Sequence, residues 1–470
     1  MSKMNLLKTL GLSLVLMSAS AQAMTLDWSG GYRIEWTEID RPTLGEPKDR
    51  KAYGLNYLYL SPKIIAADGV NIISRFDVLN FDNGSGIAHP YQHSQLGQIW
   101  GSNANVGAAN AGNQGSVNVR TSQLYLTMNQ EYGALLVGRA PFEFGLGMTY
   151  NAGKGAFDHW YDTRDMLAYK IVVGDWFFMP VLSRFNASGF GQGGTISAMG
   201  AQLQYENEEA KSLIGIFQEQ VKGANSALDY TTGQINAYGG AGATSTGALD
   251  IQRTNFVLGR GFDSFGFKFE AGFQSGNVGV ETSTGDSVAV NGYGMAAELY
   301  LVRPESKWDY SMKLGMAAGD SDNTDFGAYA FDRNYNVAML MFNHRLGQAD
   351  FFNTNVHKDS TLSVGESADD ESVSNAMYIA PTVNYAWSDR LSIRNTLVYA
   401  QLLNEVQNSV DSAKDLGLEW DIEVIYKPTE RIQWVNQVGL LFPGGAWKNG
   451  ADNFGNDFTF GLASKAAISF

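Results

Sequence analysis

The sequence predicts an all-β protein: a transmembrane, antiparallel, up-and-down β-barrel of about 18 strands, with short periplasmic turns and long extracellular loops. Three observations predict it. From Thr25 onward, apolar and polar residues alternate with a period of two. The alternating segments have roughly ten or more residues, whereas strands of soluble proteins average about five or six. Short and long connections between these segments alternate, as they do in barrels that cross a membrane.

The N-terminal strand illustrates the alternation. In LDWSGGYRIEW, Trp28, Tyr32 and Trp36 share one face, while Arg33 and Glu35 lie on the other. The segments FGFKFEAGF, KWDYSMKLGM and LGLEWDIEVIY repeat this pattern further along the chain. The alternative is a soluble propeller or sandwich, which would turn its apolar face inward and, for a propeller, would show short internal repeats that this sequence lacks.

The number of strands follows from the connections. Short turns are expected near 68–69, 129–133, 174–175, 207–210, 260–264, 303–307, 388–390 and 427–431. Long polar loops are expected near 39–51, 81–116, 146–166, 186–195, 222–247, 277–287, 320–374, 404–414 and 443–455. Together they imply about 18 strands, an even number, with both chain ends on the periplasmic side.

One segment has two interpretations. Residues 334–344, NYNVAMLMFNH, could form an additional strand. A single extra strand would break the even count, because 307–319 must run outward and 375–387 must run back inward. We therefore place 334–344 within one long external loop, 320–374, which can fold back into the lumen.

The N-terminus has the three parts of a secretory signal peptide. Lys3 and Lys8 flank the start of a short apolar run, and Ala21-Gln22-Ala23 offers a cleavage site. The prediction is a cleaved signal peptide at 1–23, export through the periplasm, and a barrel over 24–470 in the outer membrane of a Gram-negative cell. An amphipathic or buried N-terminal helix is the alternative. No later segment is apolar enough for a transmembrane helix.

The chain ends in NDFTFGLASKAAISF, which alternates up to Phe470. We expect this segment to be the closing strand, paired with the N-terminal strand, because a closed barrel leaves no unpaired edge. Phe470 would then lie in the aromatic girdle. The segment also resembles the signal that barrel-assembly machinery reads in the outer membrane, which implies that machinery as a partner and Phe470 as the assembly signal.

Three stretches resemble the alginate-export outer-membrane family. They are LGLEWDIEVIYKPTERIQW (416–434), VGRAPFEFG (137–145) and, more weakly, GDSDNTDFGAYAFDRNYNVAMLMFNH (319–344). The resemblance implies a barrel of 18 strands and a polysaccharide-related role.

Charged side chains are expected to face the lumen, since an arginine or lysine facing lipid costs about 2–4 kcal/mol at the membrane midplane. The alternative is that many of them pair across strands and only fill the wall. The predicted pore-lining residues are Arg33, Arg75, Arg139, Arg184, Arg394, Glu419 and Asp421.

Evidence for chemistry other than transport is sparse. The carboxylates Asp320, Asp322 and Asp325 form a weak calcium candidate without a complete calcium-binding loop. His89 and His93 have a helical metal spacing but lie in a Gly/Asn-rich loop. Asp158-His159 is the nearest approach to a catalytic dyad, and there is no GxSxG motif. We therefore expect no enzyme, no metal and no cofactor.

Composition narrows the partners. The 470 residues carry a formal charge of -15 and contain no cysteine, which argues against nucleic acid and excludes disulfides. The predicted function is a porin for passive diffusion of small hydrophilic solutes or ions across the outer-membrane lipid bilayer. The alternative is an adhesin or receptor acting through the loops at 81–116, 222–247 and 320–374.

Overall fold

The structure is a computed structural model. It describes residues 25–46, 48, 50–78, 92–94, 98–99, 119–186, 196–225, 232–301, 303, 305–319, 325–347, 371–404, 413–448 and 454–470. The predicted signal peptide, most of the loop at 81–116, His89, Asp320 and Asp322 lie outside the described residues.

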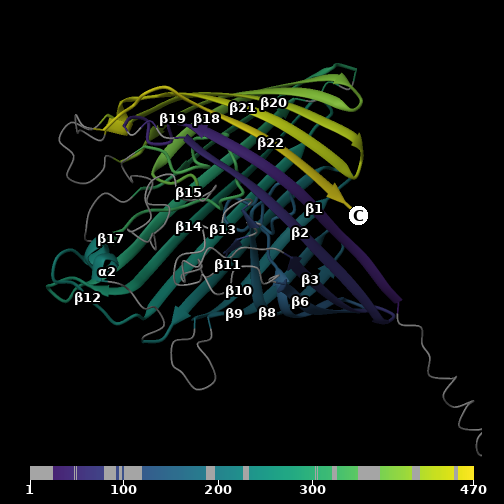
Figure 1. The fold of residues 1–470 in the computed structure, drawn as a ribbon. Helices are drawn as coiled ribbons and strands as arrows, with labels where there is room; N and C mark the ends of the chain where they lie inside the picture. Colours follow the sequence, from purple (N-terminus) through teal and green to yellow (C-terminus); the bar gives the residue numbers. More distant parts are fainter. Residues whose placement is uncertain are drawn as a thin grey trace, which may run out of the picture.

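The predicted fold class is confirmed. The described strands form one sheet of 22 strands, of which 18 are long, pair antiparallel with their neighbours and close the barrel (Figure 1). The long strands are β1 (Thr25–Asp40), β2 (Arg50–Ala67), β3 (Val70–Val78), β6 (Val119–Gln130), β7 (Gly133–Pro141), β8 (Trp160–Val173), β9 (Trp176–Asn186), β10 (Ile196–Asn207), β11 (Ser212–Gly223), β13 (Leu249–Gly261), β14 (Phe265–Glu281), β15 (Ser287–Leu301), β16 (Trp308–Ala317), β18 (Ala376–Ser388), β19 (Leu391–Leu402), β20 (Asp415–Thr429), β21 (Ile432–Pro443) and β22 (Thr459–Ser469).

The remaining elements of the described residues are short. They are β4 (Gln92–Ser94), β5 (Gln98–Ile99), β12 (Thr244–Ser245), β17 (Asp325–Phe326), the helix α2 (Thr232–Gly239) and the 3-10 turn η2 (Gly445–Lys448). Within the described residues, no helix has the length and apolar character needed to cross a membrane.

The first and last strands close the barrel. β1 pairs antiparallel with β22 from Gly31 opposite Ser469 to Ile39 opposite Gly461. The pairing extends one residue further, because the backbone N–H of Gly30 donates to the carbonyl of Phe470 (2.9 Å) and the N–H of Phe470 donates back (3.1 Å). The last residue of the sequence therefore lies inside the ladder, and β22 closes the sheet against Gly30–Ile39 of β1.

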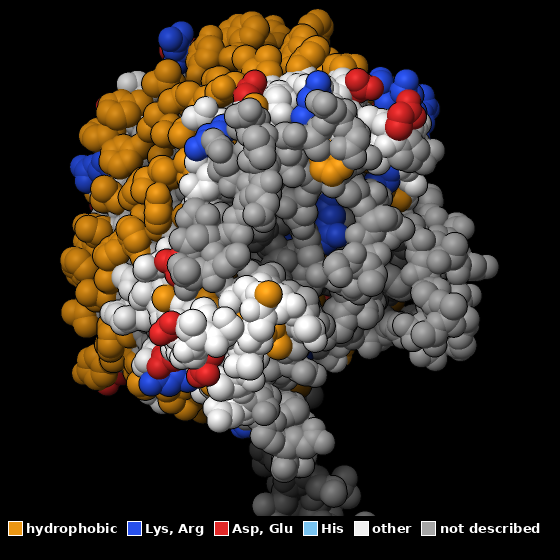
Figure 2. Space-filling view, turned by 90° about the vertical axis from the view of Figure 1, so that its left-hand side faces the viewer, with side chains coloured by type: hydrophobic (Ala, Val, Ile, Leu, Met, Phe, Trp, Pro, Cys, Tyr) orange, Lys and Arg blue, Asp and Glu red, His pale blue; other side chains and the backbone are white. Residues whose placement is uncertain are grey.

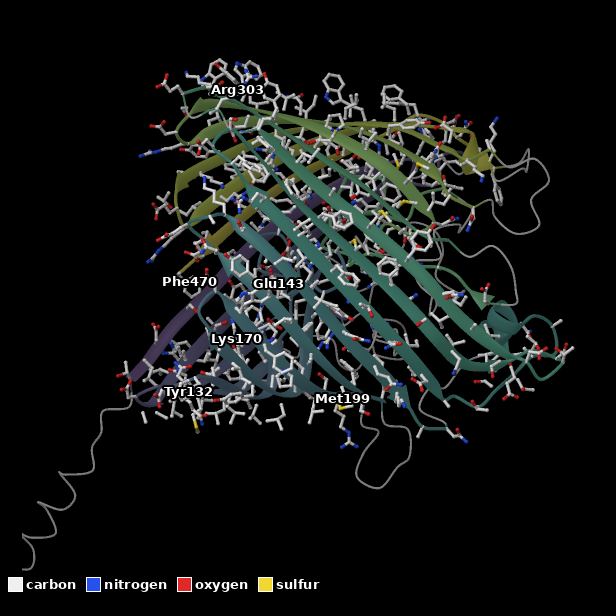
Figure 3. The ribbon with its side chains drawn as sticks, turned by 180° about the vertical axis from the view of Figure 1, so that it is seen from behind. Tyr132, Glu143, Lys170, Met199, Arg303 and Phe470 are labelled. Atoms are coloured by element: carbon white, nitrogen blue, oxygen red, sulfur yellow. The ribbon has the colours of Figure 1, made fainter. Side chains whose placement is uncertain are left out.

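The two ends of the barrel differ. One end, here called the turn end, carries the short turns and both ends of the described chain; Tyr132, Arg303 and Phe470 lie there (Figure 3). The opposite end, here called the loop end, carries α2, β12 and the long connections (Figure 1). Seen from the loop end, apolar side chains cover the outer wall, while charged side chains gather at the rim (Figure 2).

Large apolar side chains are exposed on the outer face of nearly every long strand. Trp176, Trp308, Trp387 and Trp434 lie beside the short turns, and each is 46–62% exposed. In a soluble protein this much exposed aromatic surface would be costly, whereas a membrane-spanning barrel needs an apolar belt with aromatic girdles. The alternating side chains of the opposite register point into the barrel.

Candidate functional site

Two connections fold into the barrel. The first inward loop, 142–159, joins β7 to β8, and the second inward loop, 327–347, precedes β18. Most of their apolar side chains are buried against inward-facing residues of the wall, including Phe142, Met148, Leu340 and Phe342. The structure thus places residues 334–344 inside the barrel and outside any strand.

A carboxylate of β14 holds the first inward loop. Glu270, fully buried, accepts backbone N–H groups from Leu146 (2.7 Å), Met148 (3.2 Å) and Thr149 (3.2 Å). Loop peptide groups inside a barrel cannot all reach water, so they need acceptors of this kind. Glu270 therefore fixes the course of the loop across the lumen.

A second buried carboxylate and an arginine hold the start of the same loop. Glu219 of β11 accepts the hydroxyl of Tyr150 (2.5 Å) and pairs with Arg164 of β8 (2.8 Å). The Arg164 guanidinium lies 3.8 Å from the ring centre of Phe142 and 4.6 Å from that of Tyr150. Both charged side chains are about 1% exposed, so each charge is compensated by its partner and not by water.

Carboxylates of β20 hold the second inward loop. Glu419 accepts the backbone N–H groups of Leu340 (2.6 Å) and Met341 (2.7 Å), and Asp421 accepts that of Met339 (2.9 Å). β20 presents these carboxylates at every second position on its inner face, while Trp420 points outward. The predicted pore-lining pair Glu419 and Asp421 therefore lies inside the barrel and anchors this loop.

The two inward loops contact each other. The backbone N–H of Asp332 donates to the carbonyl of Met148 (2.6 Å), and the Thr149 and Tyr329 hydroxyls are 2.8 Å apart. Burial raises the pKa of Tyr329, so its hydroxyl stays protonated. The loops form one constriction, here called the septum, across the interior.

A cavity of about 430 Å³ lies beside the septum, toward the turn end. Its described lining contains four basic side chains and one acidic one, so we call it the basic chamber. The charged lining residues are Arg33, Arg75, Lys154, Arg431 and Glu430.

Tyrosines and carboxylates orient the arginines of the basic chamber. Arg33 pairs with Glu35 (2.9 Å) and lies over the ring of Tyr57, with 4.6 Å to its centre. Arg75 pairs with Asp77 (3.0 Å) and donates to the Tyr57 hydroxyl (2.6 Å). These contacts hold both guanidinium groups in fixed positions on the wall.

A second cavity of about 600 Å³, here called the mixed chamber, is lined by residues of β15, β16 and β18–β22 and by Asn336–Met339 and Asn343 of the second inward loop. Arg394 pairs there with Glu423 (3.0 Å), and Lys313 pairs with Glu298 (3.3 Å). Basic and acidic side chains are about balanced on its wall, in contrast to the basic chamber.

Five of the seven predicted pore-lining residues face the interior, and their contribution to a pore remains a prediction. Arg33 and Arg75 line the basic chamber, Arg394 and Asp421 line the mixed chamber, and Glu419 is covered by the second inward loop.

The other two predicted residues are corrected by the structure: Arg139 and Arg184 face outward. Arg139 lies directly across β7–β8 from Asp165, and the two form a two-point ion pair (2.7 and 2.9 Å). It shares a face with Val137, which is exposed, whereas Ala140 is buried inside. Arg184 shares the outer face of β9 with Leu182. Both arginines lie near the loop end of their strands, where an outward charge reaches the membrane boundary at low cost.

Several interior residues were missing from the predicted set. Tyr57 and Tyr59 alternate with leucine in NYLYL, and this alternation was the available signal for an inward tyrosine pair. Lys154 and the septum contacts have no comparable signal, because they depend on where a loop folds.

Asp158 and His159, the nearest approach to a catalytic dyad in the sequence, have different partners in the structure. The His159 ring lies 2.8 Å from Glu35, and the Asp158 carboxylate accepts the N–H of Gly155 (2.6 Å). Burial raises the pKa of Asp158. Within the described ranges, no group of three potential ligands could hold a metal ion. Of the calcium candidates, Asp325 belongs to β17 and the other two are outside the described residues.

The fold is similar to that of an outer-membrane barrel of known structure. The chain is similar to a BenF-like porin from Pseudomonas fluorescens Pf-5, with a TM-score of 0.51, 10% identity, and coverage of 95% of this chain and 98% of that chain. It is also similar to OccAB1 from Acinetobacter baumannii, with a TM-score of 0.51, 9% identity, and coverage of 95% and 96%. No protein-family model and no curated protein matches, so the alginate-export family is not shown.

Proposed function

We propose that this protein is a porin-type channel of the Gram-negative outer membrane, through which small hydrophilic solutes or ions diffuse passively with a preference for anions. The turn end faces the periplasm and the loop end faces the outside. The observation that carries the anion preference is the basic chamber, where four of the five charged lining residues described are basic.

The charge of the chamber wall is the physical basis of the proposed ion preference. Charged side chains that line a narrow passage set the ion preference, and their effect is stronger where the walls exclude water. Arg33 and Arg75 supply two of the positive charges of that wall. Their carboxylate partners Glu35 and Asp77 orient them from behind and do not line the chamber.

The test is the reversal potential of purified channels in a planar bilayer under a salt gradient. Replacing Arg33 and Arg75 by glutamine should shift the reversal potential toward cation preference. The matched control is Arg139→Gln with Arg184→Gln, which removes the same number of charges from the outer wall. An unchanged reversal potential in the Arg33/Arg75 variant, or an equal shift in the control, contradicts the anion preference.

Other roles have less support. The polysaccharide-related role rests on the family resemblance alone, and the septum leaves chambers of about 430 and 600 Å³. The adhesin or receptor alternative depends on external loops that lie mostly outside the described residues. The expectation that the chain is not an enzyme, and the involvement of assembly machinery through Phe470, remain proposals.

A further inference from the structure

We propose that the outer wall over β7–β15, at its border toward the loop end, binds lipopolysaccharide, the phosphorylated glycolipid of the outer leaflet. This inference rests on the proposed outer-membrane location. Three features lie next to one another there: a row of charged side chains, a row of apolar side chains, and a polar hollow with aromatic walls.

The first feature is the outer charged row. Its members are direct cross-strand neighbours: Arg139, Asp165, Arg184, Ser197, Lys222 and Asp250. Asp165 pairs with Arg139, and Lys222 lies 3.5 Å from the carboxylate of Asp250. Three cations face two carboxylates, and cations placed at a membrane boundary attract anionic lipid headgroups.

The second feature is the apolar row one step nearer the turn end. Val137, Leu167, Leu182 and Met199 are direct cross-strand neighbours on the same outer face. Their side chains are exposed, with Met199 the most exposed at 65%. Acyl chains can pack on this row while phosphates reach the cations above it.

The third feature is the outer hollow, a cavity of about 240 Å³ on the outer face of β13–β15. Its outward residues form two adjacent rows. One row is Thr254, Phe273 and Tyr293, and the other, nearer the loop end, is Gln252, Ser275 and Asn291.

Amides and hydroxyls beside exposed aromatic rings suit a sugar ring, because the amides match its hydroxyls and the rings pack on its C–H faces. Gln252 is also the cross-strand neighbour of Gln220, whose amide donates to Asp250 of the charged row (2.9 Å). The hollow is therefore continuous with the charged row. Phosphates, sugars and acyl chains occur together in lipopolysaccharide, whereas a phospholipid such as phosphatidylglycerol has no sugar ring for the hollow.

The first experiment uses the wild-type protein in neutral detergent and measures binding by native mass spectrometry. The probes are lipopolysaccharide, the same lipid with its phosphates removed, phosphatidylglycerol and inorganic phosphate. We expect lipopolysaccharide to bind at least about 10-fold more tightly than each of the others, because it alone among the probes combines phosphates, sugars and acyl chains. Equal binding of phosphatidylglycerol, or undiminished binding of the dephosphorylated lipid, overturns the proposal.

The second experiment changes the protein. The triple variant Arg139→Gln, Arg184→Gln and Lys222→Gln should lose at least about 10-fold in lipopolysaccharide affinity. Its matched control, Arg260→Gln, Arg303→Gln and Lys427→Gln, removes three cations near the turn end and should bind as wild type. Equal loss in both sets overturns the site.

Two further variants separate binding from folding. Arg139→Lys with Arg184→Lys keeps the charges and should keep most of the affinity. Gln252→Ala with Asn291→Ala should reduce the preference for lipopolysaccharide over phosphatidylglycerol, and an unchanged preference contradicts the role of the hollow. Wild-type channel conductance in each variant shows that the barrel is folded, and it tests the proposed channel function separately from lipid binding.

Discussion

The carboxylate of Glu419 accepts the backbone N–H of Leu340 at 2.6 Å, which fastens the second inward loop to the barrel wall from inside. The same carboxylate accepts the N–H of Met341 through its other oxygen at 2.7 Å. A residue that looked like a pore-lining acid in the sequence is thus an anchor of the septum.

Weakening that anchor should open the channel. Glu419→Gln removes the charge and leaves one acceptor oxygen for two backbone N–H groups, and a hydrogen bond to a charged group contributes about 1.5–3 kcal/mol. A loss of about 2 kcal/mol raises the ratio of displaced to docked loop by roughly 30-fold. Single-channel recording should show larger or more frequent high-conductance states. The control is Glu423→Gln, which removes a neighbouring inward charge that contacts Arg394 and not the loop; an equal change there contradicts the anchor.

A side chain at Gly272 should displace the second inward loop. A Cβ added there would lie 2.0 Å from the Tyr329 hydroxyl, far inside contact distance. Gly272→Ala should therefore break the Thr149–Tyr329 contact between the loops, with an overpacking cost of about 1–3 kcal/mol. We expect higher conductance from Gly272→Ala, partly reversed by adding Tyr329→Phe. Gly259→Ala is the control, since its nearest neighbours would be 3.3–3.5 Å away, and wild-type conductance is expected from it.

Removing Arg164 should destabilise the barrel. The variant Arg164→Ala leaves the buried Glu219 carboxylate with the Tyr150 hydroxyl and the more distant Arg253 guanidinium at 3.9 Å, and breaking a buried pair costs about 3–5 kcal/mol. Urea unfolding followed by tryptophan fluorescence should show this loss. The matched control, Arg139→Ala, breaks an exposed pair with an expected cost of about 0–1 kcal/mol. Similar losses in the two variants would mean that the buried pair contributes no special stability.

Deleting Phe470 should impair assembly before it affects conductance. The deletion removes the two backbone hydrogen bonds to Gly30 and an aromatic side chain exposed at the turn end. Outer-membrane yield of folded protein, read as a heat-modifiable band in gel electrophoresis, should fall, while surviving channels conduct as wild type. Phe458→Ala, an exposed aromatic at the other end of the same strand segment, should assemble at the wild-type level. Normal yield after deletion of Phe470 would exclude it as the assembly signal.

The charged residues show where a period-two pattern predicts the inward or outward direction of a side chain. Arg33 and Glu35 alternate with the large apolar residues Tyr32, Ile34 and Trp36, so their inward direction follows directly from the sequence. Arg139 lies between the small residues Gly138 and Ala140, and it shares its face with Leu135 and Val137. The pattern itself therefore favours the outer wall for Arg139. The assumption that a charge avoids lipid overrode that pattern, although the assumption fails near a strand end where headgroups are within reach.

The sequence by itself determined the barrel, its 18 long strands and the closing role of its last residues, because alternation and turn chemistry are local properties that each segment carries. Only the tertiary structure decided the septum and the two chambers. The acceptors Glu270 and Glu419 are 124 and 79 residues from the N–H groups of Leu146 and Leu340 that they receive. No local pattern encodes such a contact, since it arises only when closure of the barrel brings distant wall positions and loop peptides into one interior.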